Sequence, residues 1–196
     1  MKNTEWNQAA ESVGYESDIL APSLDVIFCG LNPALSAAIA GHNFANGNNR
    51  FWKVLHLAGF TDVRLQPQDE QRLLEYGCGI TAAVRRPTKK AAEVLPDEFR
   101  QARIELESKM RSYAPRSIAF LGKRALSLMI AQSDLHWGHF PKEFAGTMAW
   151  ILPNPSGLNR GFTLDALVNA YSKLRIALAP HKSLQSKVTL PDRSDA

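Results

Sequence analysis

The chain has 196 residues, of which 45% are hydrophobic, and it carries a formal net charge of +4. This length corresponds to one domain, which can bury a core without disulfides or structural metal ions. The two cysteines, Cys29 and Cys78, are too few for a disulfide framework or a four-thiolate cluster, and no apolar run reaches the ~18 residues of a membrane span, so we expect a soluble cytoplasmic protein.

The two ends of the chain differ in composition from its middle. Residues 1–17 are polar and acidic and lack the apolar stretch of a signal peptide. Residues 180–196 hold too few apolar side chains to pack firmly. We therefore expect flexible segments at 1–17 and 180–196, on either side of one folded domain at 18–179.

Short apolar runs alternate with helical patterns along the middle of the chain. Strands are predicted where runs rich in β-forming residues stop at glycine or proline, at 24–30, 117–122 and 147–153. Helices are predicted at 50–60, 67–77, 96–114 and 163–178, and the helix-favouring segment 123–132 follows the second strand. The alternation predicts an α/β fold, a three-layer α/β/α domain with a central, mainly parallel sheet.

The predicted helices carry recognisable end signals. Pro67 and Pro96 suit a first helical turn, where a missing N–H is tolerated. Thr163 can cap the last helix, and Gly77 can end the second one.

Two of the predicted strands are followed directly by Asn-Pro. Asn32 and Pro33 follow the first strand, and Asn154 and Pro155 follow the third. Proline stiffens the turn and biases the residue before it towards extended geometry, so each amide is held at the edge where ligands bind in parallel sheets. Asn-Pro also makes ordinary turns. The occurrence of two such turns at equivalent strand ends favours one pocket bordered by both.

A long loop with glycine and aromatic residues lies between the first strand and the first helix. Phe44 in this loop can offer a ring face to a planar ligand, or it can pack the loop onto the core, and the spacing does not separate the two. Phe51 and Trp52 follow inside the helical pattern, where we expect core positions.

Several other chemistries find no support in the sequence. The chain has no phosphate-binding GxxxxGK[ST], no GxGxxG after the first strand, no GxSxG and no HExxH. Its histidines form no metal-ligand motif, and no carboxylate pair signals acid-base catalysis. We expect no metal.

Basic residues concentrate in one stretch. Residues 85–124 carry eleven Lys and Arg against five Asp and Glu, a net charge of +6. Such a cluster predicts either a surface for a polyanion or a solvated helical face.

These motifs resemble one known family, the mismatch-specific uracil-DNA glycosylase and thymine-DNA glycosylase branch of the uracil glycosylase superfamily. GLNPAL at 30–35 is similar to its first motif, GINPG, and LPNPSGLNR at 152–160 is similar to its second. GHNFANGNNRFWKVLHLAGFT, CGIT and RRPT match the segments between them, so the resemblance covers roughly residues 18–178.

The resemblance implies roles for individual residues. Asn32 matches the catalytic position that holds the hydrolytic water. The base pocket is implied to include Leu31, Ala37, Phe44, which stacks on the flipped base, and Asn154. The wedge that enters the DNA helix is implied to be Gly157, Leu158, Asn159 and Arg160. Phosphate contacts are expected from Ser156, Lys89 and Lys90.

Departures from the family patterns bear on activity. More active uracil glycosylases carry Asp and His where this chain has Asn32 and Asn154, which predicts a slow enzyme. Ala34 replaces the usual glycine after Asn-Pro and adds a methyl group near the base. Ala37, where some bacterial members have serine, is shared with the thymine-processing branch, so substrate breadth stays open.

The expected function is that of a monofunctional DNA N-glycosylase in base excision repair. It would excise uracil and 3,N4-ethenocytosine, with thymine as a further candidate, opposite guanine in double-stranded DNA, leaving an abasic site. We expect a monomer that needs no cofactor and no obligate protein partner. Two alternatives remain, a glycosylase for deaminated purines and a catalytically idle nucleic-acid-binding module.

Overall fold

The computed structural model describes residues 18–179. The terminal segments expected at 1–17 and 180–196 lie outside the described residues. No helix in the described part of the chain is long and apolar enough to cross a membrane.

Five strands form one sheet in the order β2-β1-β3-β5-β4. The strands are β1 (Val26–Gly30), β2 (Cys78–Ala82), β3 (Ser117–Leu121), β4 (Gly138–His139) and β5 (Met148–Leu152). All neighbours are parallel except β4, which pairs antiparallel with β5 at the sheet edge. The predicted mainly parallel sheet is confirmed.

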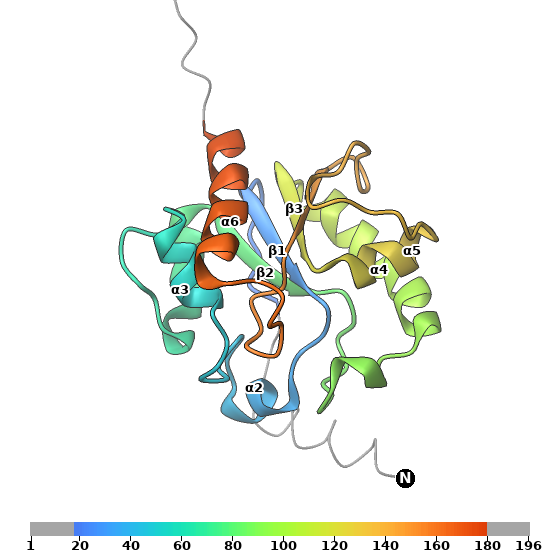
Figure 1. Cartoon of the computed structure of the whole chain (residues 1–196). Coiled ribbons are helices and arrows are strands. Elements are labelled where there is room, and N and C mark those ends of the chain that lie inside the picture. The colour runs from blue at the N-terminus through green and yellow to red at the C-terminus, as the bar shows by residue number, and fades with distance from the viewer. Residues whose placement is uncertain (1–17, 180–196) are drawn as a thin grey trace, which may run out of the picture.

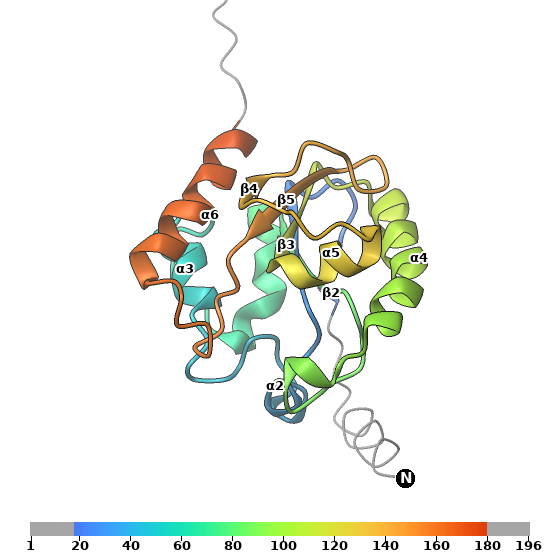
Figure 2. The ribbon, with the colours of Figure 1, turned by 45° about the vertical axis from the view of Figure 1, so that its right-hand side comes forward.

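Helices cover both faces of this sheet (Figures 1 and 2). The α-helices are α2 (Leu35–Ala40), α3 (Phe51–Leu57), α4 (Pro96–Tyr113), α5 (Lys123–Ile130) and α6 (Leu164–Leu178), and the 3-10 helices are η1 (Pro67–Tyr76) and η2 (Ala91–Glu93). One core packs α3, α6 and η1 against the sheet, and a second core packs α4 and α5 against its other face.

Successive residues of β1 alternate between the two cores. Phe28 belongs to the core under α3 and α6, whereas Ile27 and Cys29 belong to the core under α4 and α5. Side chains of a strand point alternately to its two faces, so a strand covered on both sides is apolar throughout. This explains why the predicted strands appear as continuous apolar runs.

The predicted helix ends are confirmed. Pro67 and Pro96 occupy the first turns of η1 and α4, and Gly77 ends η1 in the left-handed conformation with φ of 66°. Oγ1 of Thr163 accepts a hydrogen bond from the backbone N–H of Ala166, which caps α6.

Several parts of the prediction need correction. The segment between the first strand and the helix predicted at 50–60 was expected to be a loop, but Leu35–Ala40 within it forms α2, and the short strand β4 was not predicted. Residues 67–77 were expected to form an ordinary helix, but residues 67–76 form a 3-10 helix. Strand β2 was not predicted, because CGITA is short and has glycine at its second position. Gly79 is required there, since a Cβ at this position would lie 2.6 Å from the carbonyl oxygen of Ile19.

Cys29 and Cys78 lie buried on the adjacent strands β1 and β2 and form no disulfide bond with each other. Burial raises the pKa of the Cys29 thiol far above its ordinary value and raises the pKa of Cys78 to about 12. Both thiols are therefore neutral and packed as small apolar groups at physiological pH.

Candidate active site

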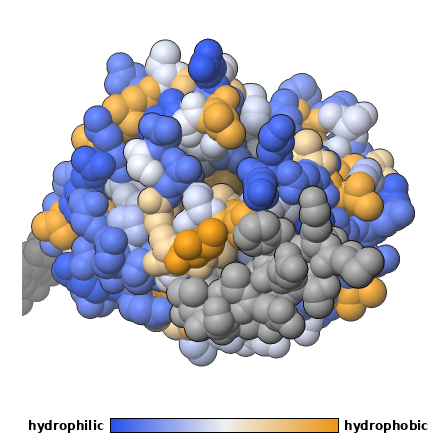
Figure 3. All heavy atoms as spheres, turned by 90° about the horizontal axis from the view of Figure 1, so that it is seen from below, coloured by the Kyte–Doolittle hydropathy of each residue, from blue (hydrophilic) through white to orange (hydrophobic). Residues whose placement is uncertain are grey.

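A cavity of about 410 Å³ opens at the carboxyl ends of the parallel strands. Its walls come from segments 30–37, 43–49, 80–91 and 154–158, together with Leu121. Figure 3 shows this side of the molecule, where apolar surface lies near the centre of the visible face and hydrophilic residues surround much of it. The volume falls in the range of sites that bind small organic groups.

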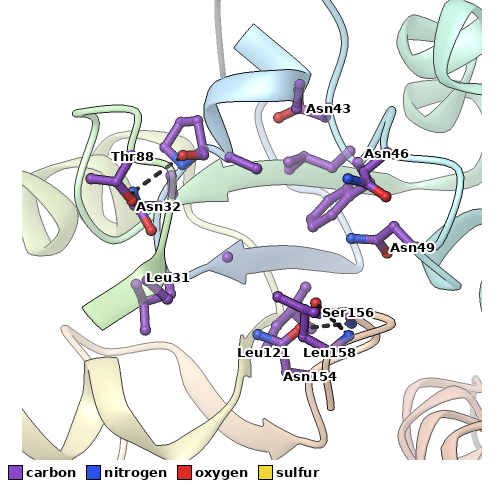
Figure 4. A pocket seen from close by; sticks show the side chains of 18 of the residues that line it. Leu31, Asn32, Asn43, Asn46, Asn49, Thr88, Leu121, Asn154, Ser156 and Leu158 are labelled. Carbon is purple, nitrogen blue, oxygen red and sulfur yellow. Dashed lines mark hydrogen bonds between the residues drawn. The ribbon is translucent and has the colours of Figure 1, made fainter. Parts of the chain in front are cut away.

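Acceptor groups behind Asn32 fix the orientation of its side-chain amide. Nδ2 of Asn32 donates to the carbonyl oxygen of Arg86 at 2.9 Å and to Oγ1 of Thr88 at 2.8 Å. The Thr88 hydroxyl in turn donates to the carbonyl oxygen of Lys90 at 3.0 Å. Because a carbonyl oxygen can only accept, these bonds settle which end of the amide is nitrogen. Oδ1 of Asn32 is left as an acceptor at the cavity wall (Figure 4).

An ion pair holds the segment that supports Asn32. Nη2 and Nε of Arg86 donate to the carboxylate of Glu98 at 2.7 and 2.9 Å. This hydrogen bonding lowers the pKa of Glu98 and raises the pKa of Arg86. The backbone N–H of Thr88 donates to the carbonyl oxygen of Pro33 at 3.1 Å, so the turn that carries Asn32 is fastened directly to this segment.

On another wall of the cavity, Asn154 presents a hydrogen-bond donor, whereas Asn32 presents an acceptor. Oδ1 of Asn154 accepts a hydrogen bond from the backbone N–H of Ser156 at 2.8 Å, which closes an Asx turn. Its backbone carbonyl oxygen accepts from Nδ2 of Asn159 at 2.9 Å. Nδ2 of Asn154 is therefore left as a donor. The cavity combines an acceptor from Asn32 with a donor from Asn154 (Figure 4).

Phe44 both lines the cavity and packs against the core. Its ring stacks on that of Phe51, with centroids 4.0 Å apart and an interplanar angle of 25°. Phe44 has a φ of 55°, in the left-handed region that an aromatic residue adopts only at a cost of about 1–3 kcal/mol. The core packing expected for Phe44 is confirmed, and the same residue also lines the cavity, whereas stacking on a ligand stays a prediction.

Glu70 anchors the residues before Phe44. The Glu70 side chain is buried, and its Oε2 accepts a hydrogen bond from the backbone N–H of Asn43 at 2.7 Å. Its Oε1 lies 3.1 Å from Nδ1 of His42. The carbonyl oxygen of Asn43 accepts from the indole Nε1 of Trp52 at 3.2 Å. These bonds hold the backbone in the conformation that Phe44 requires.

The predicted wedge forms a loop beside the cavity. Leu158 lines the cavity mouth and is 91% exposed. Gly157, Asn159 and Arg160 lie in the same loop but do not line the cavity. Ser156 lines it, and its Oγ accepts from the backbone N–H of Leu158 at 3.3 Å. The loop therefore offers one large apolar side chain to the outside.

The basic stretch divides into paired and cavity-facing residues. Seven of its eleven cations form ion pairs with carboxylates: Arg85, Arg86, Arg100, Arg103, Lys109, Arg111 and Arg116. Lys89 and Lys90 are exposed and line the cavity. Of the two remaining cations, Lys123 lies over the ring of Trp137, and Arg124 donates to the carbonyl oxygens of Ala91 and Val94. A phosphate contact by Lys89 and Lys90 stays a prediction.

Other predicted pocket residues also line the cavity. Leu31, Ala34 and Ala37 are among its wall residues. None of the described residues in the wall is a carboxylate or a histidine. Among residues 18–179 no group of three or more histidine, cysteine, aspartate or glutamate side chains could hold a metal ion. The polar side chains of the wall are amides, hydroxyls and the ammonium groups of Lys89 and Lys90.

Three residues with structural roles at the site were missed in the sequence. Thr88 supports Asn32, Glu70 supports the loop of Phe44, and Arg50 contacts the loop of Leu158. Thr88 lies in RRPT, which the resemblance included without assigning it a role. Glu70 is part of a helical pattern and carries no distinguishing signal.

The fold and the cavity define an α/β domain with an aromatic ring and two oppositely oriented amides in the wall of one cavity. The chain belongs to the uracil DNA glycosylase superfamily, since the model of that family matches residues 17–175. It is also similar to a solution NMR structure from Methanosarcina acetivorans, provisionally named a uracil DNA glycosylase, with a TM-score of 0.54 and 16% identity over 82% of this chain and 96% of that chain. The structural match supports the fold, and superfamily membership implies DNA N-glycosylase activity.

Proposed function

We propose that this protein is a mismatch-specific glycosylase that removes uracil, and also 3,N4-ethenocytosine, opposite guanine in double-stranded DNA. The observation that carries the proposal is the opposed orientation of two amides in one cavity, with Oδ1 of Asn32 as acceptor and Nδ2 of Asn154 as donor. An acceptor that orients water and a donor that stabilises the leaving anion both favour a hydrolysis in which the base departs with negative charge.

The reaction begins with extrusion of the base. An enzyme cannot reach the glycosidic bond of a stacked base, and unpairing costs least at mismatched or damaged positions. Leu158, exposed at the cavity mouth, is suited to fill the vacated space in the DNA helix. The extruded base would then stack on the ring of Phe44.

Hydrolysis follows at C1′ of the deoxyribose. The bond between C1′ and the base nitrogen breaks, and the base leaves with the electron pair. A water molecule oriented by Oδ1 of Asn32 adds its oxygen to C1′ and releases a proton to solvent. Nδ2 of Asn154 donates to a carbonyl oxygen of the leaving base, where negative charge develops. The products are the free base and an abasic site.

The groups in the cavity predict a slow reaction. An amide oxygen orients water but carries no full negative charge, and an amide N–H is a weaker donor than a protonated imidazole. A mismatch lowers the extrusion cost before chemistry starts, so selectivity would come largely from pairing strength.

The decisive experiment is a panel of labelled duplexes with one modified base opposite guanine. The bases are uracil, thymine, 3,N4-ethenocytosine, hypoxanthine and xanthine, and abasic sites are revealed by alkaline cleavage. We expect cleavage at uracil and 3,N4-ethenocytosine. Faster cleavage at hypoxanthine or xanthine would instead identify a deaminated-purine glycosylase.

Asn32→Ala is the matched control for this panel. It should lose most excision while keeping duplex affinity, because Asn32 is proposed to orient water and not DNA. Loss of one preorganised catalytic group typically lowers the rate about 100-fold or more. Binding without cleavage by the unmodified protein would show an idle DNA-binding module.

A further inference from the structure

Arg50 directs most of its hydrogen-bonding capacity at one loop. Arg50 precedes α3, and its guanidinium donates to four backbone carbonyl oxygens between residues 155 and 162. These are the carbonyls of Pro155 at 3.2 Å, Phe162 at 2.7 Å, and Ser156 and Asn159, each at 3.0 Å. The backbone N–H of Arg50 also donates to Pro155 at 3.0 Å. The Arg50 guanidinium thus binds the backbone of loop 153–162 at four positions.

A close backbone contact adds to this attachment. A Cβ placed on Gly157 would lie 2.4 Å from the carbonyl oxygen of Asn48, so glycine is needed for the loop to reach this position. Within the loop, the side chain of Asn159 donates to the carbonyl of Asn154. The base of the loop is fixed on both sides, whereas Leu158 at its tip remains 91% exposed.

The same segment, residues 42–50, also carries Phe44. Its first part is fixed by Glu70 through the backbone N–H of Asn43, and its last residue, Arg50, holds the loop of Leu158. One continuous segment therefore connects the ring that lines the cavity with the apolar side chain at the cavity mouth.

We infer that Arg50 is a positioning residue for base extrusion, which it supports by holding loop 153–162 so that Leu158 is presented at the cavity mouth before DNA arrives. This inference rests on the proposed function. A loop ordered in advance loses less conformational entropy on binding, so more of the contact energy is available for extrusion. Lysine cannot replace arginine here, because one ammonium group cannot span four carbonyls arranged around a planar fork.

The test compares Arg50→Lys and Arg50→Ala with a matched control, Arg116→Lys. The Arg116 guanidinium donates to the carbonyl of Leu178 and to Asp25, next to the amino ends of the strands and thus at the sheet edge opposite the cavity. Extrusion is measured by 2-aminopurine fluorescence next to a 2′-fluorinated, uncleavable deoxyuridine opposite guanine. Excision is measured in single turnover on the cleavable G·U duplex and on the same strand without its complement.

The Arg50 variants should show extrusion and duplex excision reduced by about tenfold, as expected for loss of several hydrogen bonds to a charged group. Excision from the single strand should change by less than about twofold, because no base has to leave a duplex. Arg116→Lys should match the unmodified protein on both substrates. Hydrogen exchange of the Arg50→Lys protein should be faster only within loop 153–162.

Equal losses on the duplex and the single strand would overturn the inference, since they indicate a general effect on the fold. Unchanged extrusion in Arg50→Lys would overturn it as well. If the unmodified protein extrudes the base but leaves no abasic site, the proposed hydrolysis fails while the Arg50 comparison still holds. If Arg50→Ala does not fold, Arg50→Lys supplies the measurement.

Discussion

Nδ2 of Asn32 lies 2.8 Å from Oγ1 of Thr88, across 56 positions of the sequence. The Thr88 hydroxyl donates its hydrogen bond to the carbonyl oxygen of Lys90, so it accepts from Asn32. The threonine therefore dictates which face of the amide meets the cavity. A residue outside the proposed chemistry thus determines which atom of the Asn32 amide faces the cavity.

Thr88→Val should lower the single-turnover excision rate about tenfold, because Asn32 loses one of its two shortest hydrogen bonds, the one to Oγ1 of Thr88. Thr88→Ser keeps the hydroxyl and should stay within about threefold of the unmodified protein. Both rates are measured on a G·U duplex. Equal rates for the valine and serine variants would contradict the orienting role of Thr88.

Charge reversal of Lys89 and Lys90 should weaken DNA binding and flatten its dependence on salt. Each phosphate contact releases counterions, so the slope of log affinity against log salt falls by roughly one for each contact that is lost. The measurement is fluorescence anisotropy of a labelled duplex at several salt concentrations. An unchanged slope would mean that these lysines do not touch phosphate.

Leu158→Ala should impair excision more on an A·U duplex than on a G·U duplex. The proposed wedge replaces lost stacking, and a well-formed pair opposes extrusion more than a mismatch does. Rates on the two duplexes are compared, with 2-aminopurine fluorescence as the reporter of extrusion. If Leu158 is only an exposed loop residue, both rates and the fluorescence amplitude stay the same.

Glu70→Ala should weaken uracil binding while Glu70→Gln should not. Alanine leaves the buried N–H of Asn43 without its acceptor, which costs about 1–3 kcal/mol and loosens the backbone next to Phe44. Glutamine can still accept from Asn43 through its carbonyl oxygen. The check is the apparent affinity for a G·U substrate, with thermal unfolding recorded in parallel. Similar affinities for both variants would separate Glu70 from the base pocket.

Stability should fall as the pH rises above about 9. The folded-state pKa values of Cys29 and Cys78 are raised above the ordinary value of 9.0, so the unfolded chain releases these protons first. The resulting loss is roughly 1 kcal/mol per thiol between about pH 8 and pH 10. Urea unfolding at several pH values measures it. The double alanine variant should be less stable at neutral pH but show a shallower fall.

Features that depend on neighbouring residues could be predicted from the sequence, whereas features that depend on residues far apart in the chain could not. Strands β1, β3 and β5 were predictable because burial on both faces leaves an apolar run that is visible locally. Strand β2 was missed because the need for Gly79 arises from Ile19, a distant neighbour. For an edge strand of five residues, the local composition carried too little information.

The same distinction holds at the candidate site. The positions of Asn32 and Asn154 could be predicted because each follows a strand end directly. The direction of the Asn32 amide could not, because its partners Arg86 and Thr88 lie more than 50 residues away. Asn154, by contrast, is oriented by the backbone N–H of Ser156, two residues further on. The four carbonyls held by Arg50 lie more than 100 residues along the chain. Such pairings depend on the complete fold and leave no local pattern.

Because Cys29 and Cys78 are buried, a cysteine introduced at the surface can be labelled selectively. Alkylating reagents react with thiolates, and both native thiols are shielded and neutral near neutral pH. A cysteine introduced by Leu158→Cys, at a highly exposed site, would then be the one thiol in the chain that reacts readily. Fluorophores or a disulfide tether to a thiol-bearing nucleotide could be attached there while the native cysteines stay in place, which would capture the loop against a chosen lesion.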